Sequence, residues 1–413
     1  MKQLERFLKY VSFDTQSKDD SSTFPSTLKQ LELAKYLLEE LKSLGVINAH
    51  LDEFGYVYAK IESNCNSSKT LGLIAHMDTA PDASGENIKP KIVTFDGNDI
   101  VLENGLILDK NDLKGKIGHQ LVVTDGTTLL GADDKAGIAL IMSFVDYIMH
   151  TEEEYPNIVV CFTPDEEVGA GTDHFNFDWY KENAKDAFTY TIDGGDIREI
   201  NYETFNAASA KIKIHGKSIH PGSAKDKMVN SALVALEFIS LLPENERPEH
   251  TENYEGFYHL TSIEGEVSLT TLSFIIRDHD KEIFECRKEK MLSIAKMIND
   301  KYGYDAVEII IEDSYYNMKE KILEKRELLD VVIDALKKNG LSPIEVPIRG
   351  GTDGARLSFE GIPCPNLGAG GENFHGPLEY LDIDDMNKML EVIKTISKVS
   401  ISFLEVKENL TLK

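Results

Sequence analysis

The amino-acid sequence predicts an α/β fold: a mixed, mostly parallel sheet with helices on both faces, interrupted by an inserted α+β domain of the ferredoxin-like type. In the first half of the 413-residue chain, short β-branched runs alternate with segments of helical spacing. Such alternation is typical of a parallel sheet covered by helices. After residue 206 the order changes to strand–helix–strand–strand–helix–strand, and alternation returns after residue 317. We therefore expect residues 1–206 and 318–413 to form one domain around a second domain at 207–317.

The strands of the first part are short and apolar. Residues 70–76 and 158–163 are rich in aliphatic side chains and too short for helices, so we expect strands that are buried on both faces. A strand end, a turn and a long helix are expected over 128–149. Another strand ends near Asp193, and residues 1–14 are predicted to form an amphipathic helix.

The inserted domain has its own pattern. Its first strand, 209–216, alternates apolar and polar residues, and a hairpin is expected to turn at Glu264 and Gly265. With a helix on each side of that hairpin and a last strand at 306–313, the order is that of a split β-α-β unit. Beyond it, a helix that stops at Gly340 precedes a strand that enters the glycine-rich loop GAGGENFHG.

Composition excludes several classes of function. The net charge of −27 disfavours nucleic acid and anionic membrane surfaces as partners, because both attract Lys and Arg. No apolar run approaches the ~20 residues that a membrane span needs, and the N-terminus lacks the pattern of a signal peptide. The four cysteines are far apart with no CxxC spacing, so we expect neither disulfides nor a thiolate zinc site, and a cytoplasmic protein.

Acids and histidines stand at the predicted strand ends. The run 158–163 is followed by Asp165, Glu166 and Glu167, three carboxylates that repel one another beside a buried strand. Other strand ends carry the same kinds of side chain: His76 and Asp78, Asp133 and Asp134, Asp193, and His375. Because parallel strands bring their carboxyl ends to one edge of the sheet, we expect these residues to lie close together. One polar strand end is usually just solvated, but five at one edge indicate a site.

A metal centre is the interpretation that best offsets so much negative charge. Histidine and carboxylate ligands without thiolates suit zinc, with manganese or cobalt as alternatives. If one carboxylate bridges, five ligands give each of two ions three protein ligands and leave a position for water, which is typical of a catalytic site. The candidate ligands are His76, Asp133, Glu167, Asp193 and His375.

The remaining acids have candidate roles beside the metals. Residues i and i+2 of an extended segment face the same way, so Asp78 can orient the imidazole of His76. Glu166 and Glu167 are adjacent and should diverge in extended backbone. One of the two can bind metal while the other takes the proton of the attacking water.

Seven longer motifs follow one another along the chain: HMDT, GADDKAG, PDEEVGAG, TIDGG, HPGSAK, RGGTDGARLS and NFHGPLEY. They resemble the motifs of the peptidase T family, the tripeptide aminopeptidases among the co-catalytic zinc aminopeptidases and carboxypeptidases. The resemblance covers nearly the whole chain, including the inserted domain. It implies a catalytic domain, a lid or dimerisation-type domain at 207–317, and two zinc ions per subunit.

The resemblance also implies which residue binds which ion. His76 and Asp193 would bind one zinc ion, and Glu167 and His375 would bind the other. Asp133 would bridge them.

Further roles follow from the same resemblance. Asp78 would support the first histidine, Glu166 would be the general base, and the peptide bond between Asp133 and Asp134 would be cis. Family members that hydrolyse peptides from the amino end resemble this chain in having Asp at the position of Asp193, whereas carboxypeptidase-like and deacylase members tend to have Glu there.

Three more residues are candidates for substrate binding. By the resemblance, His220 would lie over the active site and stabilise the oxyanion. In dimeric relatives the partner subunit supplies that histidine, which makes a homodimer a candidate assembly. Arg277 at a strand end and Arg349 at the start of RGGTDGARLS can each bind a substrate carboxylate, since the guanidinium fork matches a carboxylate bidentately.

We therefore expect a two-zinc aminopeptidase that releases the N-terminal residue from short peptides, above all tripeptides. A dipeptidase, a carboxypeptidase or an N-acyl amino acid deacylase on the same scaffold is the enzymatic alternative. The non-enzymatic alternative is a metal-holding binding protein without catalysis, which would have no use for a spare base beside Glu167.

Overall fold

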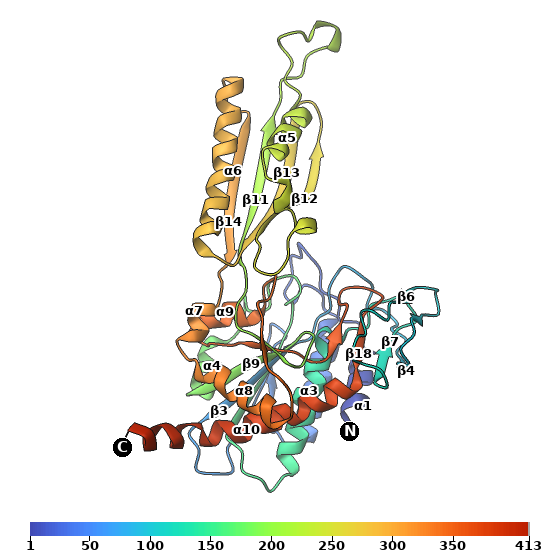
Figure 1. Ribbon diagram of the computed structural model, residues 1–413, viewed down its shortest axis with the longest axis vertical. Helices are drawn as coiled ribbons and strands as arrows, with labels where there is room; N and C mark the ends of the chain where they lie inside the picture. Colours follow the sequence, from blue (N-terminus) through green and yellow to red (C-terminus); the bar gives the residue numbers. More distant parts are fainter. Residues whose placement is uncertain (412–413) are drawn as a thin grey trace. The chain divides into compact units, whose positions relative to one another are not determined.

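The computed structural model describes the backbone of residues 1–411 and the side chains of residues 1–401. The chain divides into two compact units (Figure 1). The first unit comprises Met1–Tyr202, Lys321–Val346 and Thr352–Lys413, and the second comprises Glu203–Glu320 and Pro347–Gly351. The second unit therefore includes a short segment far along the chain, in which Arg349 lies.

An eight-stranded mixed sheet forms the middle of the first unit, in the order β1-β2-β8-β3-β9-β16-β10-β15. Its strands are β1 (His50–Leu51), β2 (Val57–Ile61), β3 (Thr70–His76), β8 (Asn157–Thr163), β9 (Ala187–Ile192), β10 (Glu199–Asn201), β15 (Ile344–Glu345) and β16 (Asn366–Leu367). β3 is parallel to β8 and β9, and β9 is parallel to β16. β2 and β10 run antiparallel to their neighbours β8 and β16. The predicted mixed, mostly parallel sheet is confirmed.

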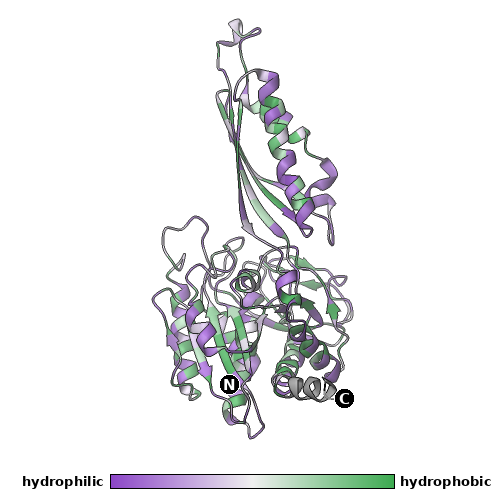
Figure 2. Cartoon of the chain, turned by 90° about the vertical axis from the view of Figure 1, so that its left-hand side faces the viewer, coloured by the Kyte–Doolittle hydropathy of each residue, from purple (hydrophilic) through white to green (hydrophobic). Residues whose placement is uncertain are grey.

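Helices cover both faces of this sheet, which explains its apolar strands. Every residue of β3 is buried, and so is every residue of β8 after Asn157. On one face α3 (Ala132–His150) packs against β3 and β9, with α1 (Gln3–Tyr10) and α10 (Ile383–Thr411) packed against α3. On the other face, side chains of α4 (Phe177–Asn183) and α9 (Asp353–Phe359) join a buried cluster with β2, β3 and β8. In Figure 2 the strands of this sheet carry the hydrophobic colour over most of their length.

The remaining elements of the first unit surround this core. They are α2 (Gln30–Ser43), α8 (Glu327–Lys338), the paired β5 (Ile100–Val101) and β6 (Ile107–Leu108), and a four-stranded sheet of β17 (Gly371–Glu372), β18 (Tyr380–Asp382), β7 (Gln120–Val123) and β4 (Lys91–Thr94). A short helix, α7 (Lys319–Leu323), begins in the second unit and ends in the first.

The segment just before Asp133 differs from the prediction. The expected strand end just before Asp133 is wrong, because residues 124–131 contain no strand and the preceding β7 belongs to the small sheet. The physical reason lies in the hydrogen bonds of this segment: the amides of Leu130 and Gly131 donate to the carboxylate of Glu379 rather than to a neighbouring strand. Asp133 therefore lies in the first turn of α3, and its peptide bond to Asp134 is cis.

The second unit is a four-stranded antiparallel sheet with two helices. Its elements are β11 (Asn206–His215), α5 (Ser231–Ser240), β12 (Phe257–Gly265), β13 (Leu269–Asp278), α6 (Lys281–Tyr302) and β14 (Val307–Tyr315), and the strand order is β12-β13-β11-β14. Burial alternates along β11 and β13, and α5 and α6 supply the apolar side chains that cover the buried face. The predicted hairpin and the ferredoxin-like order are both present.

Candidate metal centre

Three neighbouring strands of the large sheet carry part of the site. His76 is the last residue of β3, Glu166 and Glu167 follow β8, and Asp193 follows β9. β8, β3 and β9 are adjacent and parallel, so they end at the same edge of the sheet. The structure therefore gathers these four side chains where ligands of α/β sheets bind.

The other two candidate ligands do not come from strand ends of the large sheet, contrary to the expectation. Asp133 is in the first turn of α3, and His375 is in the loop between β17 and β18 with a left-handed φ of 63°. Gly137 lets α3 approach β9 closely, because a β-carbon at this position would collide with the carbonyl oxygen of Ile192. That close approach brings Asp133 next to Asp193.

Asp133 lies between the two histidines. Its Oδ1 is 2.8 Å from Nε2 of His76, and its Oδ2 is 3.6 Å from Nε2 of His375. Nε2 of His375 is also 2.9 Å from Oε2 of Glu167, and Nε2 of His76 is 4.0 Å from Oδ1 of Asp193. Through Nε2, each histidine thus faces Asp133 and one further carboxylate. The result is two groups of three side chains that share one acid.

The buried carboxylates of this cluster disfavour one another's charge. Burial raises the pKa of Asp193 well above its usual range, and the charge of Asp133 adds to the effect. Burial and the same charge raise the pKa of Glu167 to about 7. Hydrogen bonds to Asp133 and Glu167 raise the pKa of His375 to about 11. A cation among these atoms would favour ionised acids and neutral imidazoles.

One buried atom of the cluster is left without a hydrogen bond. Oε1 of Glu167 is buried and has no partner among the described residues. Buried carboxylate oxygens are normally hydrogen-bonded or bound to a cation. Ligand atoms of His76, Asp133 and Glu167 lie within 4.8 Å of one another, as do those of His76, Asp134 and Asp193. The residues therefore fit metal ions held by imidazole and carboxylate.

Asp78 connects the first histidine to the two glutamates. Nδ1 of His76 is 3.1 Å from the backbone oxygen of Asp78 and 3.4 Å from its Oδ1. The same carboxylate accepts hydrogen bonds from the amides of Glu166 at 3.0 Å and Glu167 at 3.1 Å. The structure places Asp78 beside His76, as the i, i+2 spacing suggested, and adds two amide contacts that the spacing did not predict.

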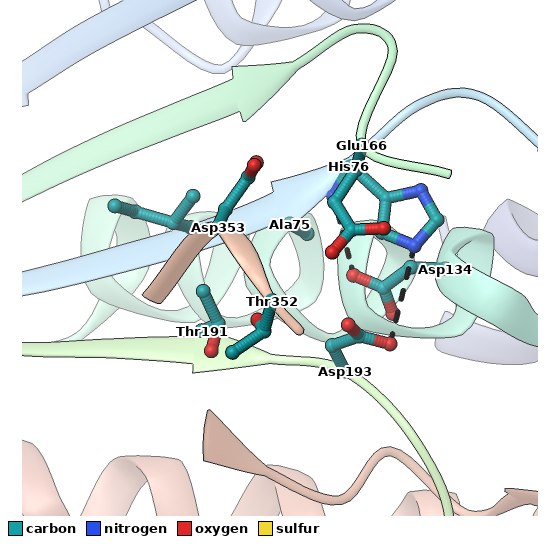
Figure 3. A pocket seen from close by; sticks show the side chains of 9 residues that line it. Ala75, His76, Asp134, Glu166, Thr191, Asp193, Thr352 and Asp353 are labelled. Atoms are coloured by element: carbon teal, nitrogen blue, oxygen red, sulfur yellow. Dashed lines mark hydrogen bonds and ion pairs between the residues drawn. The ribbon is translucent and has the colours of Figure 1, made fainter. Parts of the chain in front are cut away.

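The two glutamates point to different places. Glu166 lines a small cavity together with His76, Asp134 and Asp193 (Figure 3). Burial raises the pKa of Glu166 well above its usual range. Glu167 turns toward the second histidine instead, so the adjacent acids diverge.

Asp165, the first of the three consecutive acids after β8, has a structural role. Asp165 has a left-handed φ of 57°, and only 1% of its surface is exposed. Its carboxylate accepts hydrogen bonds from the amide of Ser26 and from Nε2 of Gln30, both at 2.6 Å. Asp165 therefore fastens the start of α2 to the loop that carries the two glutamates.

Three further buried acids surround the centre: the sequence analysis named Asp134 without giving it a role, and it missed Asp353 and Glu379. Asp134 accepts a hydrogen bond from the amide of His76 at 3.3 Å, and Asp353 accepts one from the hydroxyl of Thr163 at 2.8 Å. Glu379 binds amides of the loop before α3. All three stand inside motifs that had been singled out, GADDKAG, RGGTDGARLS and NFHGPLEY, and this was the available signal.

The three candidate substrate-binding residues lie in the second unit. His220 is exposed, precedes a short 3-10 turn at Pro221–Ser223, and accepts a hydrogen bond from the amide of Gly222 at 3.2 Å. Arg277 is the penultimate residue of β13, with its guanidinium over the ring of Tyr315. Nη1 of Arg277 donates to two backbone carbonyls.

Arg349 is tied into the second unit more extensively. Its guanidinium lies over the rings of Phe205 and Phe257. Nη1 donates to the backbone oxygen of Asn253 at 2.7 Å and to that of Glu255 at 2.9 Å, and Nη2 donates to a threonine hydroxyl at 3.0 Å. Both Nη atoms of this arginine are therefore in use within the unit.

Comparison with known proteins defines first the class and then the family. The family model described as the peptidase dimerisation domain matches residues 202–305. A tripeptidase from Staphylococcus aureus superposes with a TM-score of 0.75 at 24% identity, over 97% of this chain and 98% of that one. A dinuclear metal-binding peptidase of the M20 family from Bacillus subtilis superposes with a TM-score of 0.65 at 15% identity, over 97% and 98%. The fold is thus that of M20 peptidases.

Sequence similarity identifies the family within the M20 peptidases. Peptidase T of Clostridium perfringens is 54% identical over 401 residues, which are 96% of this chain and 98% of that protein. The chain belongs to the peptidase T family. The resemblance that the motifs indicated and the predicted fold class are both confirmed. Within the described residues, none of the helices has the length and apolar character that crossing a bilayer requires.

Proposed function

We propose that this protein is a metal-dependent aminopeptidase that releases the N-terminal residue from tripeptides. The observation that carries the proposal is the position of Asp133 between His76 and His375, with Glu166 in the adjoining cavity. Membership of the peptidase T family and the solved tripeptidase of the same fold support the choice of substrate.

Two zinc ions are the proposed cofactors, with manganese or cobalt as alternatives. His76 and Asp193 would hold one ion, Glu167 and His375 the other, and Asp133 both. The dinuclear site named for the Bacillus subtilis peptidase supports this count. When bound, such ions polarise the scissile carbonyl and make water a better nucleophile at neutral pH.

Glu166 is the proposed general base. It lines the cavity beside His76, and it is the member of the glutamate pair that does not contact His375. Its carboxylate would take a proton from the attacking water and pass it to the amino group of the leaving dipeptide as the C–N bond breaks. Asp78 would hold His76 and the backbone of Glu166 in place for this step.

The second unit would supply contacts to the substrate. We assign oxyanion stabilisation to His220. Between the two arginines, Arg277 is the stronger candidate for the C-terminal carboxylate, because Arg349 already donates from both Nη atoms within its own unit. A charge-assisted, bidentate contact of this kind would distinguish peptides by length.

Two further parts of the proposal concern assembly and location. The match of residues 202–305 to a peptidase dimerisation domain supports a homodimer. The four cysteines are all free thiols, which supports a reducing compartment such as the cytoplasm.

Turnover of a small substrate panel tests the function. The panel contains a dipeptide, a tripeptide, a tetrapeptide, an N-acetylated tripeptide and an N-acetyl amino acid, each with and without a chelator. We expect the tripeptide to lose its first residue fastest, the acetylated peptide to resist, and the chelator to abolish turnover until zinc is restored. Fastest cleavage of the N-acetyl amino acid would favour the deacylase alternative, and no turnover of any peptide by the metal-loaded protein would favour the binding protein.

A further inference from the structure

Glu379 is a buried carboxylate to which the proposed mechanism gives no task. It directly precedes β18, and 1% of its surface is exposed. Its Oε2 accepts hydrogen bonds from the amides of Leu130 at 2.6 Å and Gly131 at 2.8 Å, and its Oε1 accepts one from the amide of Asp133 at 3.1 Å. All three donors belong to the turn that leads into α3.

This turn cannot hold itself in place. The first amides of a helix have no partner within the helix and need an acceptor from outside. Gly131 is the N-cap of α3, has a left-handed φ of 76° and offers no side chain that could accept a hydrogen bond. The segment 124–131 also pairs with no strand. The backbone is non-helical at Asp133 and Asp134, and Oδ1 of Asp134 accepts from the amide of Gly137 in the regular helix that follows. The carboxylate of Glu379 therefore holds the turn before that regular helix, from a distant part of the chain.

The contact matters for the site because one of the three residues that Glu379 holds is Asp133. Asp133 donates its amide to Glu379 and presents its carboxylate to His76 at 2.8 Å and to His375 at 3.6 Å. A rotation of this turn would move the shared acid away from one histidine or the other. A buried carboxylate beside other acids is also a costly way to hold a turn, since a neutral acceptor would serve a purely structural end at less desolvation. The buried ammonium of Lys135 interacts electrostatically with Glu379 and offsets part of that cost.

We propose that Glu379 is a positioning residue, which fixes the turn before α3 so that Asp133 stands between the two histidines before any metal ion binds. The inference rests on the proposed function, because it takes Asp133 as the acid that both ions share. It predicts that Glu379 acts on metal affinity through the backbone, without touching metal or substrate. Outer-shell partners of metal ligands commonly change affinity or activity by about 10–100-fold when replaced.

The test measures zinc binding to the metal-free protein by competition with a chromophoric chelator. Glu379→Gln keeps the size of the side chain but replaces one acceptor oxygen with a donor, so at least one of the three amides must face an NH₂ group. The matched control is Asp278→Asn. Asp278 is also buried and accepts a hydrogen bond from a backbone amide, that of Asp280 at 3.0 Å, but it belongs to the second unit and binds Arg287 rather than the turn.

We expect Glu379→Gln to lower zinc affinity by about 10–100-fold. The melting temperature of its metal-free form should change no more than that of Asp278→Asn. Wild-type zinc affinity in folded Glu379→Gln would overturn the inference, and so would an equal loss of affinity in the control. Asp133→Asn distinguishes failure of the proposed metal site from failure of the role given to Glu379. If Asp133→Asn also binds zinc with wild-type affinity, the proposed metal site is wrong. If Asp133→Asn loses zinc affinity but Glu379→Gln does not, only the role of Glu379 is wrong.

A second measurement needs no variant and covers the case in which Glu379→Gln does not fold. In the metal-free wild-type protein, the amides of Leu130, Gly131 and Asp133 should exchange hydrogen as slowly as those of the neighbouring strand β7. Exchange at the rate of exposed loops would show that the turn is not held before metal binds, and would overturn the proposal.

Discussion

The carboxylate of Asp78 binds the backbone of Glu166: the amide of Glu166 donates to Oδ1 at 3.0 Å, and the next amide, that of Glu167, donates to Oδ2 at 3.1 Å. One acid therefore sets the direction in which the two glutamates leave the chain. Glu379 does the corresponding work for the turn before α3. Two carboxylates that are not proposed as ligands thus hold the loops that carry three of the proposed site residues.

The first prediction concerns this contact. Asp78→Asn replaces one acceptor oxygen with an NH₂ group, so the side chain can no longer accept from both amides. It also removes a carboxylate from beside Nδ1 of His76. We expect both kcat and zinc affinity to fall by about 10–100-fold. Steady-state kinetics and metal analysis of the purified variant check this.

Asp52→Asn is the matched control for that variant. Asp52 also accepts hydrogen bonds from two backbone amides, those of Phe54 and Tyr56, in a turn of the same unit. The control should retain wild-type kcat and metal content. Equal behaviour of the two variants would reduce Asp78 to an ordinary turn residue.

The second prediction separates the adjacent glutamates. Glu166→Gln should keep both metal ions and lose about 10²–10⁴ in kcat, the contribution of a positioned acid–base group. Glu167→Gln should lower metal occupancy, because Glu167 contacts His375 and has a second, buried oxygen without a hydrogen bond in the described part of the chain. Metal content measured by atomic emission beside kcat decides between them. The roles are reversed if Glu166→Gln is the variant that loses metal.

The third prediction concerns His220. His220→Ala should lower kcat by about 10²–10³, the usual cost of one oxyanion donor. Metal content and melting temperature should stay at the wild-type level, because the side chain is exposed and accepts a hydrogen bond from the local amide of Gly222. His215→Ala is the control, because His215 is an exposed histidine at the end of β11 in the same unit. Unchanged kcat in His220→Ala would remove this histidine from the mechanism.

The fourth prediction is that a charged C-terminus matters. A charge-assisted hydrogen bond contributes about 1.5–3 kcal/mol, so the unmodified enzyme should cleave a tripeptide roughly 10–100-fold faster than its C-terminal amide. Arg277→Ala should erase most of that ratio, which is read from kcat/KM for the two substrates. One extra residue displaces the carboxylate by about 3.3–3.6 Å, so a tetrapeptide should behave like the amide.

Arg349→Ala provides the contrast for that experiment. Since Arg349 stacks on Phe205 and Phe257 and binds two carbonyls, its loss should lower the melting temperature and leave the acid-to-amide ratio intact. The assignment of the two arginines would be exchanged if Arg349→Ala were the variant that equalises the substrates. Equal cleavage of acid and amide by the wild type would leave substrate length to the walls of the site.

Local pattern accounts for the parts of the structure that were predicted well. β3, β8 and β9 are buried on both faces, so their apolar runs are visible in any window of sequence, and the acids that end them follow directly. The second unit was equally readable, because burial alternates along β11 and the hairpin of β12 and β13 is local. The seven motifs, which follow one another along nearly the whole chain, then indicated the family.

Contacts between distant segments explain what was not predicted. The apolar pair Leu129 and Leu130 before α3 predicts a strand end, but the amides of Leu130 and Gly131 bind Glu379, about 250 residues further on. Arg349 belongs to the second unit through contacts with residues far from it in sequence: it stacks on Phe205 and Phe257 and donates hydrogen bonds to residues 251–255. No periodicity in a single segment carries such information.

The first unit is assembled from chain segments on both sides of the second, and this order has a consequence for the protein while it is being made. On the proposed ligand set, His76, Asp133, Glu167 and Asp193 leave the ribosome early, whereas His375 follows after the whole of the second unit. The loop that carries His375 is placed by β18, which pairs with β7, about 260 residues earlier in the chain. A nascent polypeptide therefore has no complete set of proposed ligands until translation is nearly finished, and fragments released early would lack the second histidine.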